Sequence, residues 1–572
     1  MKKSLLSLAA MAALVSVNVA QGAPDKQQAA VSSVVLISVD GLHQNDLTWF
    51  VQHHPASTLA RMVSAGVAFQ NARTPFPSDS FPGMVGLATG GHPRTTGVYY
   101  DDAYSRGLLP VGTTDCAHPH LGAEVQYAEN VDKNLDRLDA GQNIPGLYNN
   151  LDLIAQLSAH PAKDLIDPAQ LPVDPKTCSP LFPHQYLKVN TVFEVLHAHG
   201  MHTAWSDKHA AYDILNGPSG VGIDDLFTPE INSSVTDPSL PAGAGPDFTK
   251  NNLDTQRYDG LKVKAVLNWL QGHDHAGNGK PGTPALLGMN FQAVSTAQKL
   301  NLSSYVDSKT GNVVTNGLAG YITDASGQTA PGPVLEGALA FVDQQIGRLV
   351  NAADLNKTVF IVTAKHGQSP QKRADLTIIN DGDMIDALNA AWATKTGTAA
   401  STPLVAHAMD DDGVLLWLND RSEAATQFAS DFLYHYAGTG IGSDAAGNKV
   451  AKAFTNAGLK KIFAGRDAAD FIGVSTHDER VPDVIGIAKL GSVYGGSKLS
   501  KIAEHGGDAI EDRHVGLVVF GNTIHAAEVK QPVDTTSVAP TILKLLGLPA
   551  EQLQAVRLEG TRPLPLLGDR DE

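Results

Sequence analysis

The sequence contains little cysteine, fewer basic than acidic residues, and no long apolar run outside its N-terminus. Cysteine occurs twice in 572 residues, at Cys116 and Cys178, which excludes a fold built on disulfide bonds or on cysteine-rich metal knuckles. No run beyond the N-terminus approaches the roughly 18–20 apolar residues that span a bilayer, so we expect no membrane partner. Lys and Arg number 42 against 59 Asp and Glu, and the net charge of −17 argues against a nucleic-acid-binding surface.

The composition is that of a globular chain. Hydrophobic residues make up 42% of it, which excludes a disordered polymer, and its 54 glycines follow no triplet period, which excludes collagen. Lys2 and Lys3 precede an apolar stretch over residues 5–19 and small residues over 20–24. This pattern predicts a signal peptide over residues 1–22 and a periplasmic or secreted protein, with a retained membrane anchor as the alternative. In an exported protein the two cysteines are expected to pair.

Short apolar runs alternate with segments of helical period. The runs have the length of buried strands and cover residues 34–39, 285–289, 359–363, 484–488 and 515–520. The helical segments cover residues 191–199, 337–352 and 537–546. This alternation predicts an α/β fold with a mostly parallel sheet and helices on both faces.

Two segments interrupt the alternation. Residues of about 103–190 are rich in Pro, Asp and Gln, and residues of about 370–480 are rich in Ala, Thr, Gly and Asp. We expect one α/β domain over residues 31–572, in which these two insertions form a cap over the strand ends.

Polar residues follow the predicted strands where a parallel sheet places its ligands. Asp40 follows the first strand, and Lys365-His366-Gly367 follows the strand over residues 359–363. Ser80 stands in a Pro-Ser-Asp-Ser-Phe-Pro segment, and His505 in Glu-His-Gly-Gly. Each motif alone is weak evidence, because Asp-Gly is a common turn and a serine is a common helix N-cap.

The order of these motifs resembles the alkaline phosphatase superfamily, in particular its type I phosphodiesterase/nucleotide pyrophosphatase branch, from residue 34 to about 566. The resemblance implies an alkaline phosphatase-like fold and an exported hydrolase of phosphate esters. It further implies that Asp40, His366 and His505 are metal ligands. Ser80 would be both a metal ligand and the nucleophile that forms a phosphoseryl intermediate.

The chain departs from the family pattern at several ligand positions. Lys365 replaces the aspartate of an Asp-His-Gly element, and an ammonium group cannot ligate a metal. Gln292 and Thr296 stand where the family has an Asp-His pair, and neither is a usual zinc ligand. The resemblance nevertheless implies a divalent metal cofactor, with zinc as the expected ion, in one or two copies. Lys365 either replaces missing positive charge as a catalytic residue or simply pairs with Asp40, and the sequence favours neither.

The expected partner is a small phosphorylated substrate. Candidate substrate-binding residues are Lys208, Asn290, Gln292 and Gly83, the last standing where the family has an asparagine. Three alternatives remain open: a non-catalytic binding protein on the same fold, a hydrolase of phosphonate or sulfate esters, and a metal-free enzyme in which Lys365 stands in for a metal.

Overall fold

A nine-stranded sheet forms the centre of the core. The computed structural model describes residues 31–127, 131–233, 247–308, 310–397, 399 and 401–566. The strand order is β24-β2-β23-β14-β1-β9-β7-β8, with β25 beside β2. The bounds are β1 Ser33–Val39, β2 Val67–Arg73, β7 Ala204–Ser206, β8 Asp225–Phe227, β9 Leu286–Phe291, β14 Thr358–Thr363, β23 His514–Phe520, β24 Ala527–Val529 and β25 Val533–Asp534.

The sheet is mostly parallel, as predicted. β14, β1, β9, β7 and β8 run parallel to one another, whereas β23 runs antiparallel to both β2 and β14. All seven residues of β1 are buried, because helices cover both faces of a parallel sheet. The carboxyl ends of β1, β7, β9 and β14 consequently meet at one edge.

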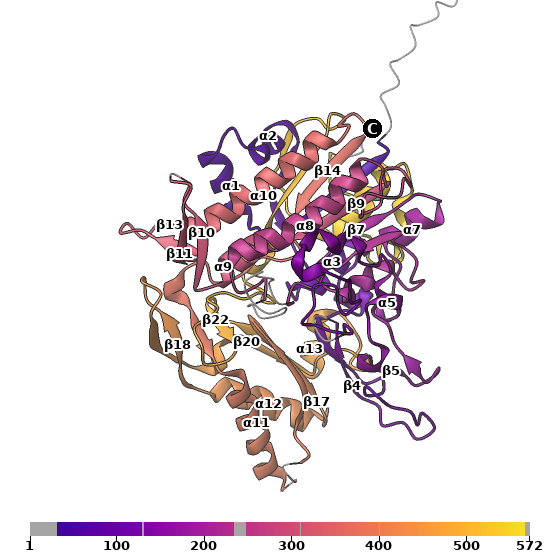
Figure 1. The fold of residues 1–572 in the computed structure, drawn as a ribbon. Coiled ribbons are helices and arrows are strands. Elements are labelled where there is room, and N and C mark those ends of the chain that lie inside the picture. The colour runs from indigo at the N-terminus through magenta and orange to yellow at the C-terminus, as the bar shows by residue number, and fades with distance from the viewer. Residues whose placement is uncertain are drawn as a thin grey trace, which may run out of the picture.

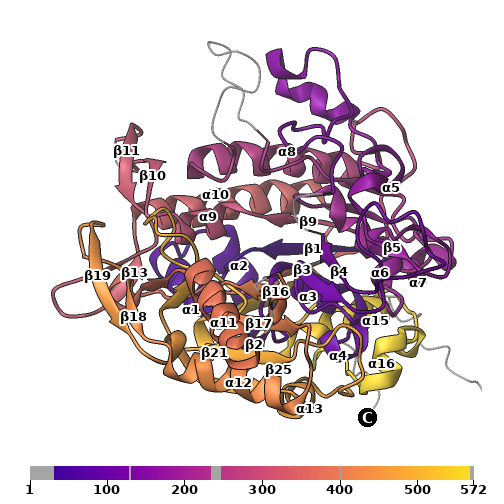
Figure 2. The same cartoon turned by 90° about the horizontal axis from the view of Figure 1, so that it is seen from below.

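Two helical layers enclose the sheet (Figure 2). One contains α8 (Asn252–Leu270), α9 (Ala293–Lys299) and α10 (Pro333–Ala352), which pack against one another. The other contains α3 (Ser80–Thr89), α7 (Val192–Ala198) and α15 (Val538–Leu545). The helices predicted over residues 191–199, 337–352 and 537–546 correspond to α7, α10 and α15.

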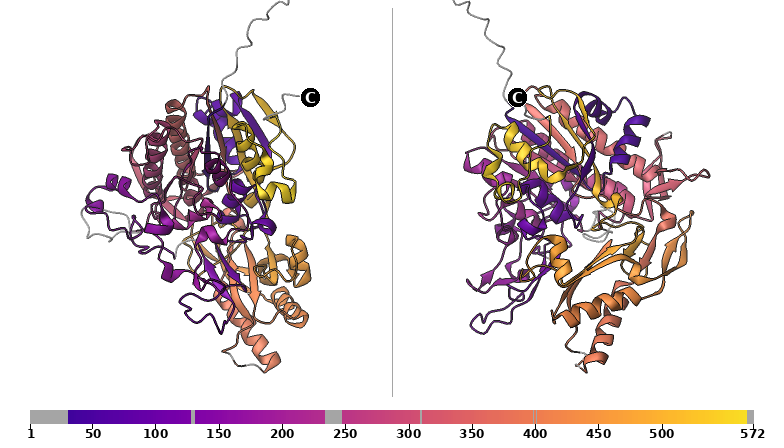
Figure 3. Two further views of the ribbon diagram at one scale, coloured as in Figure 1. Left: turned by 90° about the vertical axis from the view of Figure 1, so that its right-hand side faces the viewer. Right: turned by 180° about the vertical axis from the view of Figure 1, so that it is seen from behind.

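A cap lies at one end of the core (Figures 1 and 3). Two four-stranded sheets build it, in the orders β19-β18-β15-β22 and β16-β17-β21-β20. Their strands are β15 Thr377–Ile379, β16 Val405–Asp410, β17 Gly413–Leu418, β18 Gly438–Ser443, β19 Lys449–Phe454, β20 Leu459–Ala464, β21 Val484–Ala488 and β22 Ser492–Tyr494. Three helices accompany them, α11 Asp381–Thr396, α12 Glu423–His435 and α13 Arg466–Ile472.

The cap corrects one prediction. The run over residues 484–488, expected in the main sheet, is β21, which lies antiparallel between β17 and β20 in the cap. An apolar run of strand length shows that a strand is buried but not which sheet it joins. The cap sheets therefore continue to Tyr494, beyond the predicted insertion boundary near 480.

The first insertion contains the hairpin of β3 (Asp102–Ser105) and β4 (Ala123–Gln126) and the short strands β5 (Val173–Asp174) and β6 (Ser179–Pro180). A disulfide joins Cys116 to Cys178 across this insertion, as expected. The predicted signal peptide lies outside the described residues. Among the helices that the structure describes, none has the length and apolar character to cross a membrane.

Candidate active site

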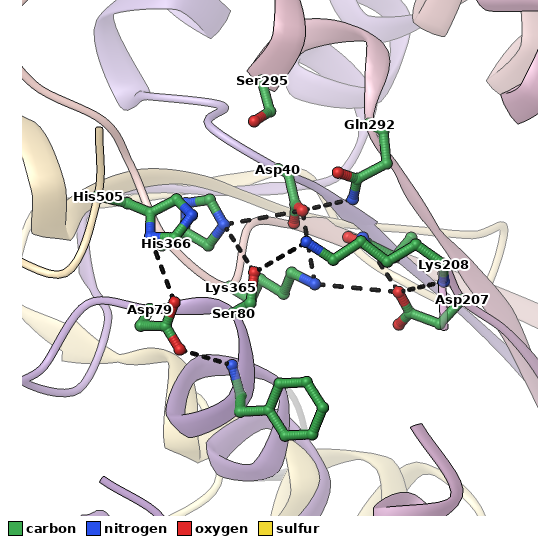
Figure 4. Close-up of polar contacts among 12 residues, drawn as sticks. Asp40, Asp79, Ser80, Asp207, Lys208, Gln292, Ser295, Lys365, His366 and His505 are labelled. Atoms are coloured by element: carbon green, nitrogen blue, oxygen red, sulfur yellow. Dashed lines mark hydrogen bonds and ion pairs between the residues drawn. The ribbon is translucent and has the colours of Figure 1, made fainter. Parts of the chain in front are cut away.

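Polar side chains from four strand ends converge at one edge of the sheet (Figure 4). Asp40 follows β1, Lys208 follows β7, Gln292 follows β9, and Lys365 and His366 follow β14. The converging strands of a parallel sheet thus bring together residues that are hundreds of positions apart in the chain.

Ser80 opens helix α3 and points into this group of side chains. Its Oγ lies 3.4 Å from Nε2 of His366 and 3.4 Å from Nζ of Lys208, which donates to it. The helix N-cap is the preceding residue, Asp79, whose Oδ2 accepts from the backbone N–H of Phe81 at 3.1 Å. The alternative in which Ser80 merely caps the helix is therefore wrong, because Asp79 fills that position.

The orientation of His366 suits it to accept a proton. Its Nδ1 lies 2.9 Å from the carbonyl oxygen of Gly367, which can only accept a hydrogen bond. In the neutral ring the proton therefore sits on Nδ1, and the lone pair of Nε2 faces Ser80.

Asp40 is fully buried and surrounded by donors. Its Oδ2 lies 3.4 Å from Nζ of Lys365 and 3.7 Å from Nε2 of His366, and it accepts a hydrogen bond from the amide of Gln292. Burial alone would raise the pKa of the Asp40 carboxyl, but the charge of Lys365, together with that of Lys208, lowers it well below its usual value. Asp40 is therefore ionised and holds the nearby cations.

The two lysines differ in how tightly they hold their protons. Burial lowers the pKa of Lys365, and the carboxylates of Asp40 and Asp207, at 3.4 and 3.9 Å, oppose this only in part. Its ammonium group also donates to the hydroxyl of Tyr212 and lies over that ring. Burial likewise disfavours the charge on Lys208, but Asp40, Asp101 and Asp207 outweigh it and raise the pKa of Lys208.

His505 lies beside His366, with ring centroids 4.1 Å apart. Its Nδ1 is 3.2 Å from Oδ1 of Asp79. Burial and the positive charge of Lys299 lower the pKa of His505 well below its usual value, so the ring is neutral. His505 thus contacts the N-cap of α3, which carries the nucleophile candidate.

Two predicted substrate-binding residues have other roles in the structure. A Cβ at Gly83 would clash with the carbonyl oxygen of Lys365, so glycine lets α3 approach the Lys365 turn, and an asparagine would not fit. The buried amide of Asn290 donates to Oδ1 of Asp207 at 3.4 Å, which orients that carboxylate.

A polar cavity of about 380 Å³ opens beside these groups. Asp40, Lys208, Gln292 and His505 line it next to the strand ends. Further lysines line its outer part, at positions 250, 299 and 501. Lys208 and Gln292, which were predicted as substrate-binding residues, both lie on the wall of this cavity.

Several contacts of the site were not predicted from the sequence. Asp207 and Tyr212 are buried and hold Lys365. Asp79 could have been found, since an acidic residue directly before a helix is a common N-cap signal. The contacts of Asp207 and Tyr212 join distant segments and leave no local signal.

A match over most of the chain shows the family to which it belongs. Residues 34–508 match the family described as type I phosphodiesterase / nucleotide pyrophosphatase. The chain belongs to this family. It is therefore a relative of phosphoric ester hydrolases, and its described core has the fold expected for them. A search of curated protein sequences finds no match to the chain.

Two solved structures are similar to the chain at low sequence identity. The alkaline phosphatase PafA has a TM-score of 0.55 and 13% identity, and the alignment covers 94% of this chain and 99% of that one. The murine ectonucleotide pyrophosphatase / phosphodiesterase 5 has a TM-score of 0.48 and 13% identity, with 91% and 96% covered. At such identity the PafA match shows an alkaline phosphatase-like fold and nothing finer.

Members of this superfamily generally use divalent metals. Asp40 and His366 are of the types that zinc uses, a carboxylate and an imidazole. An ion bound to Asp40, Ser80 and His366 would, however, lie beside the ammonium groups of Lys365 and Lys208, which contact the same oxygens and would repel it. Oδ1 of Asp40 lacks a hydrogen-bond partner among the described residues, but the two ammonium groups make this a poor site for a cation.

A second metal position, at which the family has an Asp-His pair, also lacks suitable ligands. The amide nitrogen of Gln292 donates to Asp40. Oγ1 of Thr296 donates to Thr255 at 3.1 Å and accepts from the amide of Asn252 at 2.9 Å. The residues around Ser80 therefore do not fit a pair of zinc ions.

Proposed function

We propose that this protein is an exported hydrolase of phosphoric esters in which Ser80 is the nucleophile and two lysine ammonium groups replace the metal charge. The observation that carries this proposal is the position of Ser80 Oγ, 3.4 Å from both the base His366 and the cation Lys208. A nucleophile within reach of a base and a cation is the arrangement that activates a hydroxyl.

The first chemical step follows from these contacts. The Ser80 proton moves to Nε2 of His366 while Oγ attacks phosphorus, and the bond to the ester oxygen breaks. Imidazolium formation at His366 is stabilised by Asp40, whose Oδ2 lies 3.7 Å away. The product is a phosphoseryl intermediate, which water then hydrolyses.

Charge on the phosphoryl group is stabilised by groups already in place. Lys208 reaches the attacking oxygen, and Lys365 adds a second buried positive charge next to it. Ser80 also stands at the N-terminus of α3, a ten-residue helix, whose dipole adds partial positive charge there. Preorganised donors of this kind are worth most where water is excluded.

Export and substrate size are part of the same proposal. The Cys116–Cys178 disulfide supports an oxidising compartment, such as the periplasm or the extracellular space. The cavity of about 380 Å³, with its lysine-rich wall, supports a small phosphorylated substrate. The family match supports a phosphodiester or nucleotide pyrophosphate ester ahead of a monoester.

The proposal is tested with p-nitrophenyl phosphate and bis-p-nitrophenyl phosphate as substrates. We expect turnover of at least one ester, loss of turnover in Ser80→Ala, and a mass increase of one phosphoryl group on rapidly quenched wild-type protein. Ser57→Ala is a matched control, because Ser57 also stands at a helix start, as N-cap of α2 (Thr58–Ala65), but outside the site. Turnover that survives Ser80→Ala would overturn the proposal, and no turnover of any ester would favour a binding protein.

A further inference from the structure

A buried histidine–glutamate pair lies on the wall of the cavity, next to the proposed site. His209 directly follows Lys208 and lines the same cavity as Asp40 and Lys208. Its Nδ1 lies 2.9 and 3.0 Å from the two carboxylate oxygens of Glu230. The side chains are 2% and 0% exposed, so the pair is fixed in position.

Glu230 is held in position by further contacts. Its Oε1 accepts from the backbone N–H of Asn232 at 2.9 Å. Burial, the neighbouring Glu230 carboxylate and the hydrogen bond between the two groups raise the pKa of Asp132 well above its usual value, so Asp132 carries a proton. Glu230 is thus fixed on the side of His209 that carries Nδ1.

The proposed reaction needs a proton donor that the groups already described do not supply. His366 takes the proton of Ser80, and Lys208 and Lys365 hold carboxylates and the nucleophile. His505, the other histidine on the cavity wall, packs against the ring of His366 and lies 3.2 Å from Asp79.

We propose that His209, oriented by Glu230, is the general acid that protonates the leaving oxygen and the general base that activates the hydrolytic water. This inference rests on the proposed function. A carboxylate bound to Nδ1 directs Nε2 away from itself, and such a pair stabilises the imidazolium form. His209 is thus the counterpart of His366 in a metal-free, two-histidine reaction.

Protons and bonds balance over the two steps. In the first, Ser80 gives its proton to His366, Oγ bonds to phosphorus, and the departing ester oxygen takes a proton from Nε2 of His209. In the second, water gives a proton to His209, its oxygen bonds to phosphorus, and the departing Oγ recovers its proton from His366. Both histidines return to their initial states.

The test compares a phenyl ester and a 4-nitrophenyl ester of phosphate, which differ only in the leaving group. Phenolate is the poorer leaving group and needs protonation, whereas 4-nitrophenolate leaves largely unaided. His209→Asn keeps a donor near the Nδ1 position but removes Nε2. We expect kcat/KM to fall about 10²–10⁴-fold for the phenyl ester and less than about 10-fold for the 4-nitrophenyl ester.

Two further variants keep the result interpretable. Glu230→Gln should show the same dependence on the leaving group with a smaller loss, and it covers the case in which His209→Asn does not fold. His184→Asn is the matched control, since Nδ1 of His184 is bound to Asp213 at 2.6 Å outside the cavity, and it should treat both esters as wild type does.

Equal losses for both esters in His209→Asn and Glu230→Gln, or no loss, would overturn the role of His209 while leaving the proposed function intact. Turnover that survives Ser80→Ala would instead overturn the proposed nucleophile. If the wild-type protein turns over neither ester, both proposals fall.

Discussion

Nζ of Lys365 lies 3.4 Å from Oδ2 of Asp40, and both side chains are fully buried. Two opposite charges removed from water stabilise a fold only while both are present, because either one alone is costly to bury. The pair therefore links the loop after β1 to the loop after β14 at the point where the proposed reaction takes place.

Replacing Lys365 with methionine tests this pair. Lys365→Met leaves Asp40 with fewer cations, so we expect the free energy of unfolding to fall by about 3–5 kcal/mol. We expect kcat to fall about 10²–10³-fold with the loss of one stabilising charge. Chemical denaturation and ester turnover measure the two effects.

The control for Lys365→Met is Lys264→Met. Lys264 is half exposed and lies 3.2 Å from exposed Asp152, so its loss should change stability by less than about 1 kcal/mol. Asp40→Asn combined with Lys365→Met should recover part of the lost stability but none of the activity. Activity in that double variant equal to wild type would show that the pair is structural only.

Gly83 provides a second prediction, based on close packing. A Cβ there clashes with the carbonyl oxygen of Lys365, so Gly83→Ala should push α3 and Ser80 away from the Lys365 turn. We expect the free energy of unfolding to fall by about 1–3 kcal/mol, because overpacked cores move the backbone. Turnover should fall by more than this loss of stability alone explains. Thermal unfolding and ester hydrolysis measure both.

Gly260 offers the matched control for Gly83. It lies within α8, and an added Cβ would meet no atom within 4 Å. Gly260→Ala should therefore stabilise the protein by about 0.5–1 kcal/mol and leave turnover unchanged. A similar effect of the two substitutions would contradict the packing role of Gly83.

The sequence allowed the sheet and the gathering of polar side chains at its edge to be predicted, because both depend on local signals. Buried parallel strands are continuous apolar runs, and the polar residue after each run lies at the ligand-binding edge, as Asp40 and His366 do. The run over residues 484–488 was misplaced because its partners, β17 and β20, are chosen by tertiary packing. Nothing in the local sequence encodes that choice.

The partners of the site residues could not be predicted for a related reason. The sequence left open whether Lys365 pairs with Asp40, and the contacts with Asp207 and Tyr212 join segments more than 150 positions apart. Gly83 looked like a lost substrate contact, since a substitution shows what is missing but not what now fills the space. The structure shows that the backbone of Lys365 fills it.

The pH dependence of turnover tests the charge on Lys365. Burial lowers its pKa, so the ammonium group gives up its proton at a lower pH than an ordinary lysine, whose pKa is about 10.4. The reaction uses the protonated form of Lys365, so kcat/KM should fall as the pH rises. This fall should begin at a pH below the ordinary lysine pKa of about 10.4. Lys365→Arg keeps its proton and should move this decline to higher pH. An alkaline limb at the same pH in Lys365→Arg would assign it to another group.

The C-terminal helix α16 (Gln554–Glu559) supplies a stability prediction. Oε2 of Glu559 lies 2.6 Å from Nδ1 of His92 and 3.1 Å from Arg94. Although burial opposes it, hydrogen bonds from His92 and Thr95 lower the pKa of Glu559 from the ordinary 4.5 to about 2. The stabilising contribution of ionised Glu559 is therefore complete above pH 4.5 and is lost as the pH falls towards about 2.

Glu559→Gln should reduce the free energy of unfolding at neutral pH by about 1–2 kcal/mol, with allowance for solvent screening. Near the lowered pKa the variant and the wild type should be equally stable. Glu551→Gln, at an exposed position, is the control and should show no such convergence. A constant difference between Glu559→Gln and wild type across this pH range would refute the ion-pair account.

The most direct test of the central claim is turnover of bis-p-nitrophenyl phosphate by protein that has been stripped with a chelator and shown by elemental analysis to hold no divalent metal. If Lys365 and Lys208 replace the metal charge, the stripped protein keeps its kcat/KM, added zinc does not raise it, and Ser80→Ala abolishes it. Loss of turnover on stripping, with recovery when zinc is returned, would contradict the account.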